Sequence, residues 1–269
     1  MVEMEPKTLK PAAPNNNPRR VLITGASRGI GRACALEFAK QGDRLTLVAR
    51  STDRLAEVAE GCKAKGAAEI VCLPANLSLE SAREACGNQT GNIDILVNNA
   101  GAIRGGGLFD ISMEEWRDSW ELKVFGYIHL CQLYGQMMRA AKSGIIVNII
   151  GIAGKDLRPD YICGSAGNAA LIAFTKALGA EMQKYNVRVF GINPSATDTD
   201  RVRSLYRQRA ETKLGNADRW EEMLDKDSLP FGRLKSASEV AALAAMCCSK
   251  EVKYLSGTVI DMDGGARWI

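Results

Sequence analysis

The stretch Thr24-Gly25-Ala26-Ser27-Arg28-Gly29-Ile30-Gly31 decides the fold class of this chain of 269 residues. It follows an apolar run, residues 21–24, that predicts a strand, and it opens an amphipathic pattern, residues 29–41, that predicts a helix. Glycines at such a turn let the backbone approach a pyrophosphate, and the helix N-terminus offers free N–H groups and a partial positive charge. Strand, loop and helix together therefore predict a nucleotide-binding unit.

The same alternation continues along the chain. The apolar runs that predict strands are residues 21–24, 45–49, 70–73, 93–97, 145–150, 187–192 and 258–261, and the helical patterns include residues 29–41, 51–65, 113–141 and 165–185. Strands that alternate with helices favour parallel β-α-β units, so the sequence predicts an α/β fold with a doubly wound parallel sheet, the Rossmann fold. The charged residues 197–229 break the alternation and predict a helical lid.

Size and composition predict one domain, residues 20–269, behind a disordered tail of residues 1–19 that is rich in Pro and Asn. A net charge of +4 without a clustered basic tract argues against nucleic acid as a partner. Without a signal-peptide pattern or an apolar run long enough to cross a bilayer, we expect no membrane partner. The eight cysteines form no C-x-x-C pair, which fits reduced thiols in a cytoplasmic protein.

Three motifs carry a family resemblance. The first loop reads T-G-x-x-x-G-x-G, Asn98-Asn99-Ala100-Gly101 follows the fourth predicted strand, and Asp263-Gly264-Gly265 lies near the end. In this order and spacing the chain resembles the short-chain dehydrogenase/reductase family from about residue 20 to residue 269. The resemblance implies a cofactor site at the strand ends, made of Gly25, Ser27, Arg28, Gly29, Ile30, Gly31, Arg50, Ser51, Asn76, Leu77, Asn99, Ala100, Gly101, Pro194 and Thr199.

The cofactor that we expect is NADP(H). The second predicted strand ends in Ala49-Arg50, where an acidic residue would hold the ribose hydroxyl of NAD. Arg50 and Arg28 offer guanidinium forks that suit a dianionic 2′-phosphate, although two solvated surface arginines are the alternative. By resemblance, Asn76 stands at the adenine position, and Thr199 ends a P-G-x-x-x-T motif that binds the nicotinamide carboxamide, with Ser195 replacing its glycine.

The proton-transfer residues of the family look replaced. The family uses an Asn, a Ser and the Tyr and Lys of Y-x-x-x-K, yet no tyrosine of this chain precedes a lysine by four residues. Matching the stretch around Asn148 to I-V-N-I-S-S-x-A-G puts Gly151 at the serine position. The same resemblance puts Gly164 and Asn168 at the tyrosine and lysine positions, and Lys123 at that of the asparagine. The chain is therefore identified as a divergent member without the usual set.

We predict a rebuilt active site without a metal. Lys123 would supply a positive charge, and Tyr161 or Lys123 would donate the proton. The alternatives are that Lys123 reaches solvent or pairs with Glu121 or Asp118, and that Tyr161 is only a pocket wall. Four arginines of the lid can either clamp a carboxylate or phosphate of the substrate or form a solvated helix face: Arg201, Arg203, Arg207 and Arg209.

The predicted function is an NADP(H)-dependent oxidoreductase that acts on a carbonyl or alcohol group of a small molecule through this atypical site. Two alternatives stay open. One is a non-redox enzyme, such as a cyclase, isomerase or lyase, that keeps NADP(H) as part of its pocket wall. The other is a catalytically silent NADPH-binding protein. The habit of the family further implies a homodimer or homotetramer.

Overall fold

The computed structural model describes residues 17–101, 103–224, 227 and 229–266. Its centre is a parallel sheet of seven strands in the order β3-β2-β1-β4-β5-β6-β9. The strands are β1 (Arg20–Thr24), β2 (Arg44–Ala49), β3 (Glu69–Pro74), β4 (Ile95–Asn98), β5 (Gly144–Ile149), β6 (Val187–Pro194) and β9 (Thr258–Met262). All seven predicted strands are confirmed, with ends that agree within two residues. The strand order reverses between β1 and β4, and ligands of doubly wound sheets bind at such a point.

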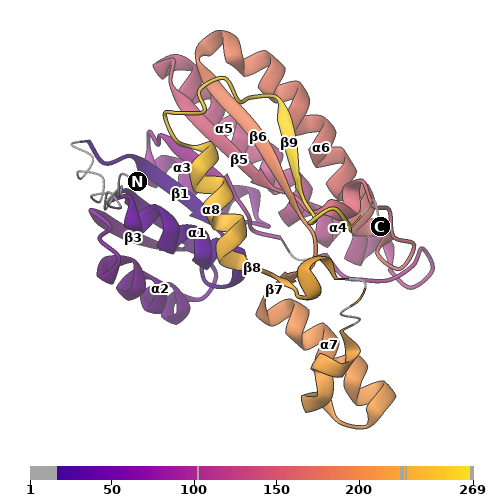
Figure 1. The fold of residues 1–269 in the computed structure, drawn as a ribbon. Coiled ribbons are helices and arrows are strands. Elements are labelled where there is room, and N and C mark those ends of the chain that lie inside the picture. Colours follow the sequence, from indigo (N-terminus) through magenta and orange to yellow (C-terminus); the bar gives the residue numbers. More distant parts are fainter. Residues whose placement is uncertain (1–16, 102, 225–226, 228, 267–269) are drawn as a thin grey trace, which may run out of the picture.

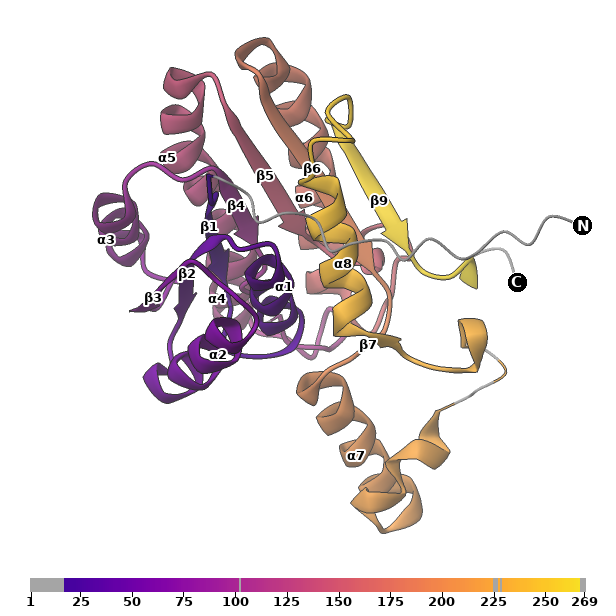
Figure 2. The same ribbon diagram turned by 60° about the vertical axis from the view of Figure 1, so that its left-hand side comes forward.

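Helices cover both faces of the sheet (Figures 1 and 2). On one face lie α1 (Gly29–Lys40), α2 (Thr52–Ala64) and α8 (Ala237–Cys247), and on the other lie α3 (Glu80–Thr90), α5 (Gly126–Ala141) and α6 (Ile162–Met182). Alternate residues of β1 enter the two cores: Ile23 packs in the cluster that contains Phe38 of α1, and Leu22 in the one that contains Tyr134 of α5. The predicted doubly wound α/β fold is confirmed.

The single helix predicted for residues 113–141 is interrupted. The chain forms α4 (Met113–Trp120), then one π-helical turn over Glu121–Phe125, and then α5. A capping box between Ser112 and Glu115 starts α4. The π turn contains Lys123, and such turns occur frequently at functional sites.

The segment predicted as a lid contains the short strand β7 (Thr197–Asp198), α7 (Asp200–Leu214) and a 3-10 segment, Ala217–Met223. The strand β7 pairs with β8 (Lys235–Ser236). Figures 1 and 2 show α7 projecting from the body of the molecule on the side where β7 and β8 lie. A further 3-10 turn, Pro230–Gly232, precedes β8.

At the N-terminus, residues 1–16 of the predicted tail lie outside the described residues. Arg19, at its end, is part of the folded domain. Its Nη2 lies 2.6 Å from Oδ2 of Asp43, whose side chain is fully buried. Within the described ranges, the structure contains no helix with the length and apolar character needed to span a bilayer.

Candidate active site

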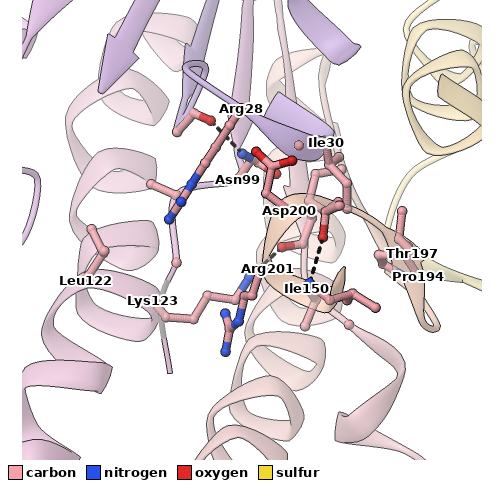
Figure 3. A pocket seen from close by; sticks show the side chains of 18 of the residues that line it. Arg28, Ile30, Asn99, Leu122, Lys123, Ile150, Pro194, Thr197, Asp200 and Arg201 are labelled. Carbon is pink, nitrogen blue, oxygen red and sulfur yellow. Dashed lines mark hydrogen bonds between the residues drawn. The ribbon is translucent and has the colours of Figure 1, made fainter. Parts of the chain in front are cut away.

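A cleft of about 1420 Å³ lies at the carboxyl ends of the central strands (Figure 3). Fourteen of the fifteen residues predicted to bind the cofactor line it, and Gly31 does not. A Cβ atom on Gly31 would lie 2.2 Å from the carbonyl oxygen of Gly25, so this glycine serves the close packing of the loop against its helix. Of the predicted proton-transfer positions, Lys123, Gly151, Asn168 and Tyr161 line the cleft.

The glycine loop is held in place by the end of β4. Gly25 adopts a φ of +64°, which glycine reaches without strain. Asn99 Nδ2 donates a hydrogen bond of 3.0 Å to the carbonyl oxygen of Thr24, and the backbone N–H of Ala100 donates one of 3.0 Å to Thr24 Oγ1. These bonds join the loop after β1 to the loop after β4, at the point where the strand order reverses.

Three arginines lie along one end of the cleft. Arg28, Arg50 and Arg54 are exposed and line it, and no ion pair involves any of them in the part of the chain that the structure describes. Arg54 was not among the residues predicted from the sequence. Its place one helical turn after Arg50, behind the α2 cap at Ser51, is the signal that could have found it. This end of the cleft suits a group with more than one negative charge.

Other predicted cofactor residues have structural partners already. Asn76 Oδ1 accepts hydrogen bonds from Ser78, and Leu77 is buried. The hydroxyl of Thr199 caps α7 by accepting the backbone N–H of Val202 at 3.4 Å. Pro194 is the last residue of β6. Asn76, Leu77, Pro194 and Thr199 line the cleft as predicted, and Val202 lines it as well.

Lys123 is buried, with 8% of its surface exposed, at the inner end of the cleft. Its Nζ donates to the hydroxyl of Tyr127 at 2.9 Å and to the carbonyl oxygen of Ile149 at 2.7 Å. It does not pair with Glu121, whose carboxylate binds Arg83. Burial and, secondly, the charge of Arg201 lower the pKa of Lys123 to about 7. Tyr127, which lies one helical turn after Lys123, was not among the residues predicted from the sequence.

Tyr161 covers the glycine at position 164. A Cβ atom on Gly164 would lie 2.0 Å from Cε1 and 2.6 Å from the hydroxyl oxygen of Tyr161. The ring of Tyr161 therefore occupies the space that a side chain at position 164 would need. Burial raises the pKa of Tyr161, while the neighbouring Arg201 acts in the opposite direction. The hydroxyl of Tyr161 is therefore protonated and able to donate at neutral pH.

Gly151 and Asn168 face each other across the inner cleft. Gly151 has a φ of +137°, and a Cβ atom there would lie 3.0 Å from Asn168 Nδ2. Asn168 is 3% exposed, and its Oδ1 has no hydrogen-bond partner among the described residues. A buried amide oxygen without a partner is costly unless a ligand or water donates to it.

The arginines of the predicted lid segment have different surroundings. Arg203 pairs with Asp198 at 2.6 Å, and Arg207 lies 3.9 Å from Asp218. Arg201 turns inward, lines the cleft and donates to the carbonyl oxygen of Ile103. The side chain of Arg209 lies outside what the structure describes.

No metal was expected from the sequence. The described residues include one cluster able to hold an ion, formed by Glu80, Glu84 and His129, whose ligand atoms lie within 4.8 Å of one another. None of these residues lines the cleft. His129 Nδ1 accepts a hydrogen bond of 3.1 Å from Arg83 Nε, so it is already engaged in the packing of α3 against α5.

Comparison with known proteins extends over nearly the whole chain. The chain is 31% identical over 256 residues to the NADPH-dependent reductase BacG of Bacillus subtilis, covering 92% of this chain and 97% of that protein. It is 32% identical over 248 residues to a 3-oxoacyl-[acyl-carrier-protein] reductase of Aquifex aeolicus, covering 91% and 95%. The structure of L-sorbose reductase from Gluconobacter frateurii, complexed with NADPH and L-sorbose, superimposes with a TM-score of 0.87. The two chains are 30% identical, with 93% of this chain and 96% of that chain covered.

The profile of the short chain dehydrogenase family matches residues 19–210. This stretch runs from the start of β1 into the middle of α7, so it contains the glycine loop, the strand order reversal and the inner cleft. The chain therefore belongs to the short-chain dehydrogenase/reductase family of oxidoreductases.

Proposed function

We propose that the protein is an NADP(H)-dependent oxidoreductase that acts on a carbonyl or alcohol group of a small molecule, with Lys123 in place of the proton-transfer residues usual in its family. One observation carries the proposal. A buried ammonium group lies at the inner end of the same cleft whose other end holds three arginines without carboxylate partners among the described residues. NADPH-dependent relatives support the choice of cofactor.

The residues at the outer end fit NADP(H). Arg28, Arg50 and Arg54 would hold the 2′-phosphate, and the loop from Gly25 to Gly31 would hold the pyrophosphate at the N-terminus of α1. Ala49 ends β2 without a carboxylate that would repel the phosphate. When bound, the reduced nicotinamide supplies a hydride, and the protein has to supply the proton.

Lys123 is suited to be that proton donor. With a pKa of about 7, a substantial share of the side chain is protonated at neutral pH, and a general acid works best when its pKa lies near the working pH. The bonds to Tyr127 and Ile149 use two of the three N–H groups of the ammonium form, so one remains for a substrate oxygen. Tyr161, protonated at neutral pH, would orient that oxygen by a second hydrogen bond.

The first test is a titration with NADPH and NADH that follows nicotinamide fluorescence. We expect NADPH to bind more tightly, because charge-assisted hydrogen bonds to its 2′-phosphate contribute about 1.5–3 kcal/mol each, roughly 10- to 150-fold in affinity. The variant Arg50→Ala should show a weaker preference, by roughly 10- to 150-fold, and keep its affinity for NADH. Equal affinities for the two nucleotides in the unaltered protein would refute the assignment of the arginines.

A screen of carbonyl substrates then tests the chemistry. Removing a general acid costs about 10²- to 10⁴-fold in rate, so Lys123→Met should lower kcat by that factor while NADPH still binds. Product formation without a change in nicotinamide absorbance would instead favour a cyclase, isomerase or lyase. Tight NADPH binding without turnover of any substrate would favour a silent nucleotide-binding protein.

A further inference from the structure

A second, smaller cavity of about 90 Å³ adjoins the inner end of the cleft. Lys123, Tyr161, Asn168 and Arg201 line both the cavity and the cleft, so the two spaces share one wall. One water needs only about 10–15 Å³ of such space, so this cavity has room for a larger group.

The charges around this small cavity are of one sign. Arg201 and Lys123 are cations, and no acidic side chain is among the described residues that line it. The positive charge of Arg201 acts on Lys123 and disfavours its protonated form. Figure 3 shows both side chains reaching into the same part of the cleft. Two cations without a counterion repel each other, and an anion between them would remove that cost.

Both cations have hydrogen-bond donors to spare. Arg201 donates to the carbonyl oxygen of Ile103, and its guanidinium group carries five N–H donors in all. Lys123 has one further N–H in its ammonium form. Asn168 adds an acceptor, because its buried Oδ1 lacks a partner among the described residues. The cavity therefore suits a ligand that accepts from the two cations and donates to the amide from a hydroxyl group.

We propose that this small cavity binds a carboxylate of the substrate at Arg201 while Lys123 donates its remaining N–H to the reacting oxygen, so that the protein acts on small oxo or hydroxy acids. The inference rests on the proposed function and names its substrate class. A carboxylate is favoured over a phosphate dianion, because the site holds one permanent guanidinium charge and one lysine that is only partly charged at neutral pH.

The position of Arg201 gives the carboxylate a second role. Arg201 belongs to the first turn of α7, whereas Lys123 belongs to the π turn before α5. An oxo acid with its carboxylate at Arg201 and its reacting oxygen at Lys123 would therefore join the lid segment to the body of the domain. Arg203, two residues further along α7, is already paired with Asp198 and provides a matched control.

The test measures binding rather than turnover. Pyruvate and levulinate, each beside its methyl ester, are titrated by calorimetry into the protein saturated with NADP⁺. At least one acid should bind roughly 10- to 150-fold more tightly than its ester, as expected for hydrogen bonds to a charged group. Arg201→Gln should abolish this preference, and Arg203→Gln should keep it. Nicotinamide fluorescence verifies in each variant that NADPH binding is intact.

Each other outcome overturns the inference. If neither acid binds more tightly than its ester, the cavity is no carboxylate site, and NADPH binding shows whether the proposed function survives that failure. If inorganic phosphate competes and binds more tightly than both acids in an Arg201-dependent manner, the site is one for phosphate. If NADPH itself does not bind, the proposed function fails, and the inference fails with it because the substrate class rests on that function.

Proton uptake on binding distinguishes a Lys123 that interacts with the bound acid from a Lys123 that only lines the cavity. A carboxylate beside the amine raises its pKa, so binding at pH 8 should take up a fraction of a proton, measured by calorimetry in two buffers that differ in ionisation enthalpy. The other titratable groups around it are Arg201, Tyr127 and Tyr161, and burial raises the pKa values of the two tyrosines. Lys123→Met should therefore abolish the uptake.

Discussion

Replacing Gly164 by alanine tests whether Tyr161 occupies the space above this position. The new Cβ atom would lie 2.0 Å from Cε1 and 2.1 Å from Cζ of Tyr161, far inside van der Waals contact. The backbone of Gly164 is helical, in the first turn of α6, so alanine there is otherwise favourable. The effect on stability therefore depends on the ring of Tyr161.

Two opposing contributions set the magnitude. Inserting a methyl group into a filled space costs about 1–3 kcal/mol, and exchanging glycine for alanine within a helix stabilises by roughly 0.5–1 kcal/mol. In the unaltered background we expect a net loss of up to about 2 kcal/mol in the free energy of unfolding. In a Tyr161→Ala background the clash is absent, so Gly164→Ala should stabilise the protein by roughly 0.5–1 kcal/mol.

The assay is urea unfolding of the four proteins of this double-mutant cycle, followed by circular dichroism. Gly135→Ala in α5 is the matched control, because a Cβ atom there meets only Met182 Cε at 3.8 Å, an ordinary contact. A coupling energy of about 1–3 kcal/mol between positions 161 and 164 is expected. If Gly164→Ala stabilises both backgrounds equally, the ring of Tyr161 does not occupy the space beside position 164.

Two further predictions concern stability. The pKa of Lys123 falls from 10.5 in the unfolded chain to about 7, so above pH 7 the unfolded chain binds more protons than the folded one, and this residue makes stability rise with pH. Between pH 7 and 8.5 the protein should gain about 1.5 kcal/mol relative to Lys123→Met in urea unfolding at each pH, and parallel curves would contradict this. Arg19→Ala should cost about 3 kcal/mol, because it leaves the fully buried Asp43 without its ion pair, and a loss below 1 kcal/mol by the same assay would argue against that role.

The parts of the structure that the sequence predicts well are local. Each strand of the sheet is a short apolar run, and the glycine loop lies between a strand and a helix that follow each other in the chain. The residues that line the outer cleft come from the ends of these strands, so a motif with the right spacing places them. Arg54 was not predicted as a cofactor residue because it lies within α2, outside the motif.

The inner cleft depends on contacts between distant segments. Lys123 enters it because the helix predicted for residues 113–141 contains a π turn, and because Gly101 lacks a side chain: a Cβ atom there would lie 2.6 Å from Lys123 Cδ. Arg201 arrives from the lid segment, 78 positions later in the chain. The family resemblance predicted Lys123 at this site and left open whether Arg201 enters it, but spacing along the sequence contains neither the π turn nor the packing of separate elements that decides these contacts.

The proposal that the inner cleft is a rebuilt catalytic site, rather than one that has lost its function, has an energetic argument behind it. A lysine with a pKa lowered from 10.5 to about 7 costs several kcal/mol while it is charged, about 1.4 kcal/mol for each pKa unit. Uncharged residues of similar volume would fill the same space without that cost, and strongly shifted pKa values occur preferentially at functional sites. The contact between Gly164 and Tyr161 also favours a rebuilt site, because the ring of Tyr161 needs the space that glycine leaves open. A site that had merely lost its proton donor would have no use for a buried amine, a protonated phenol and an unpartnered amide oxygen that line one small cavity.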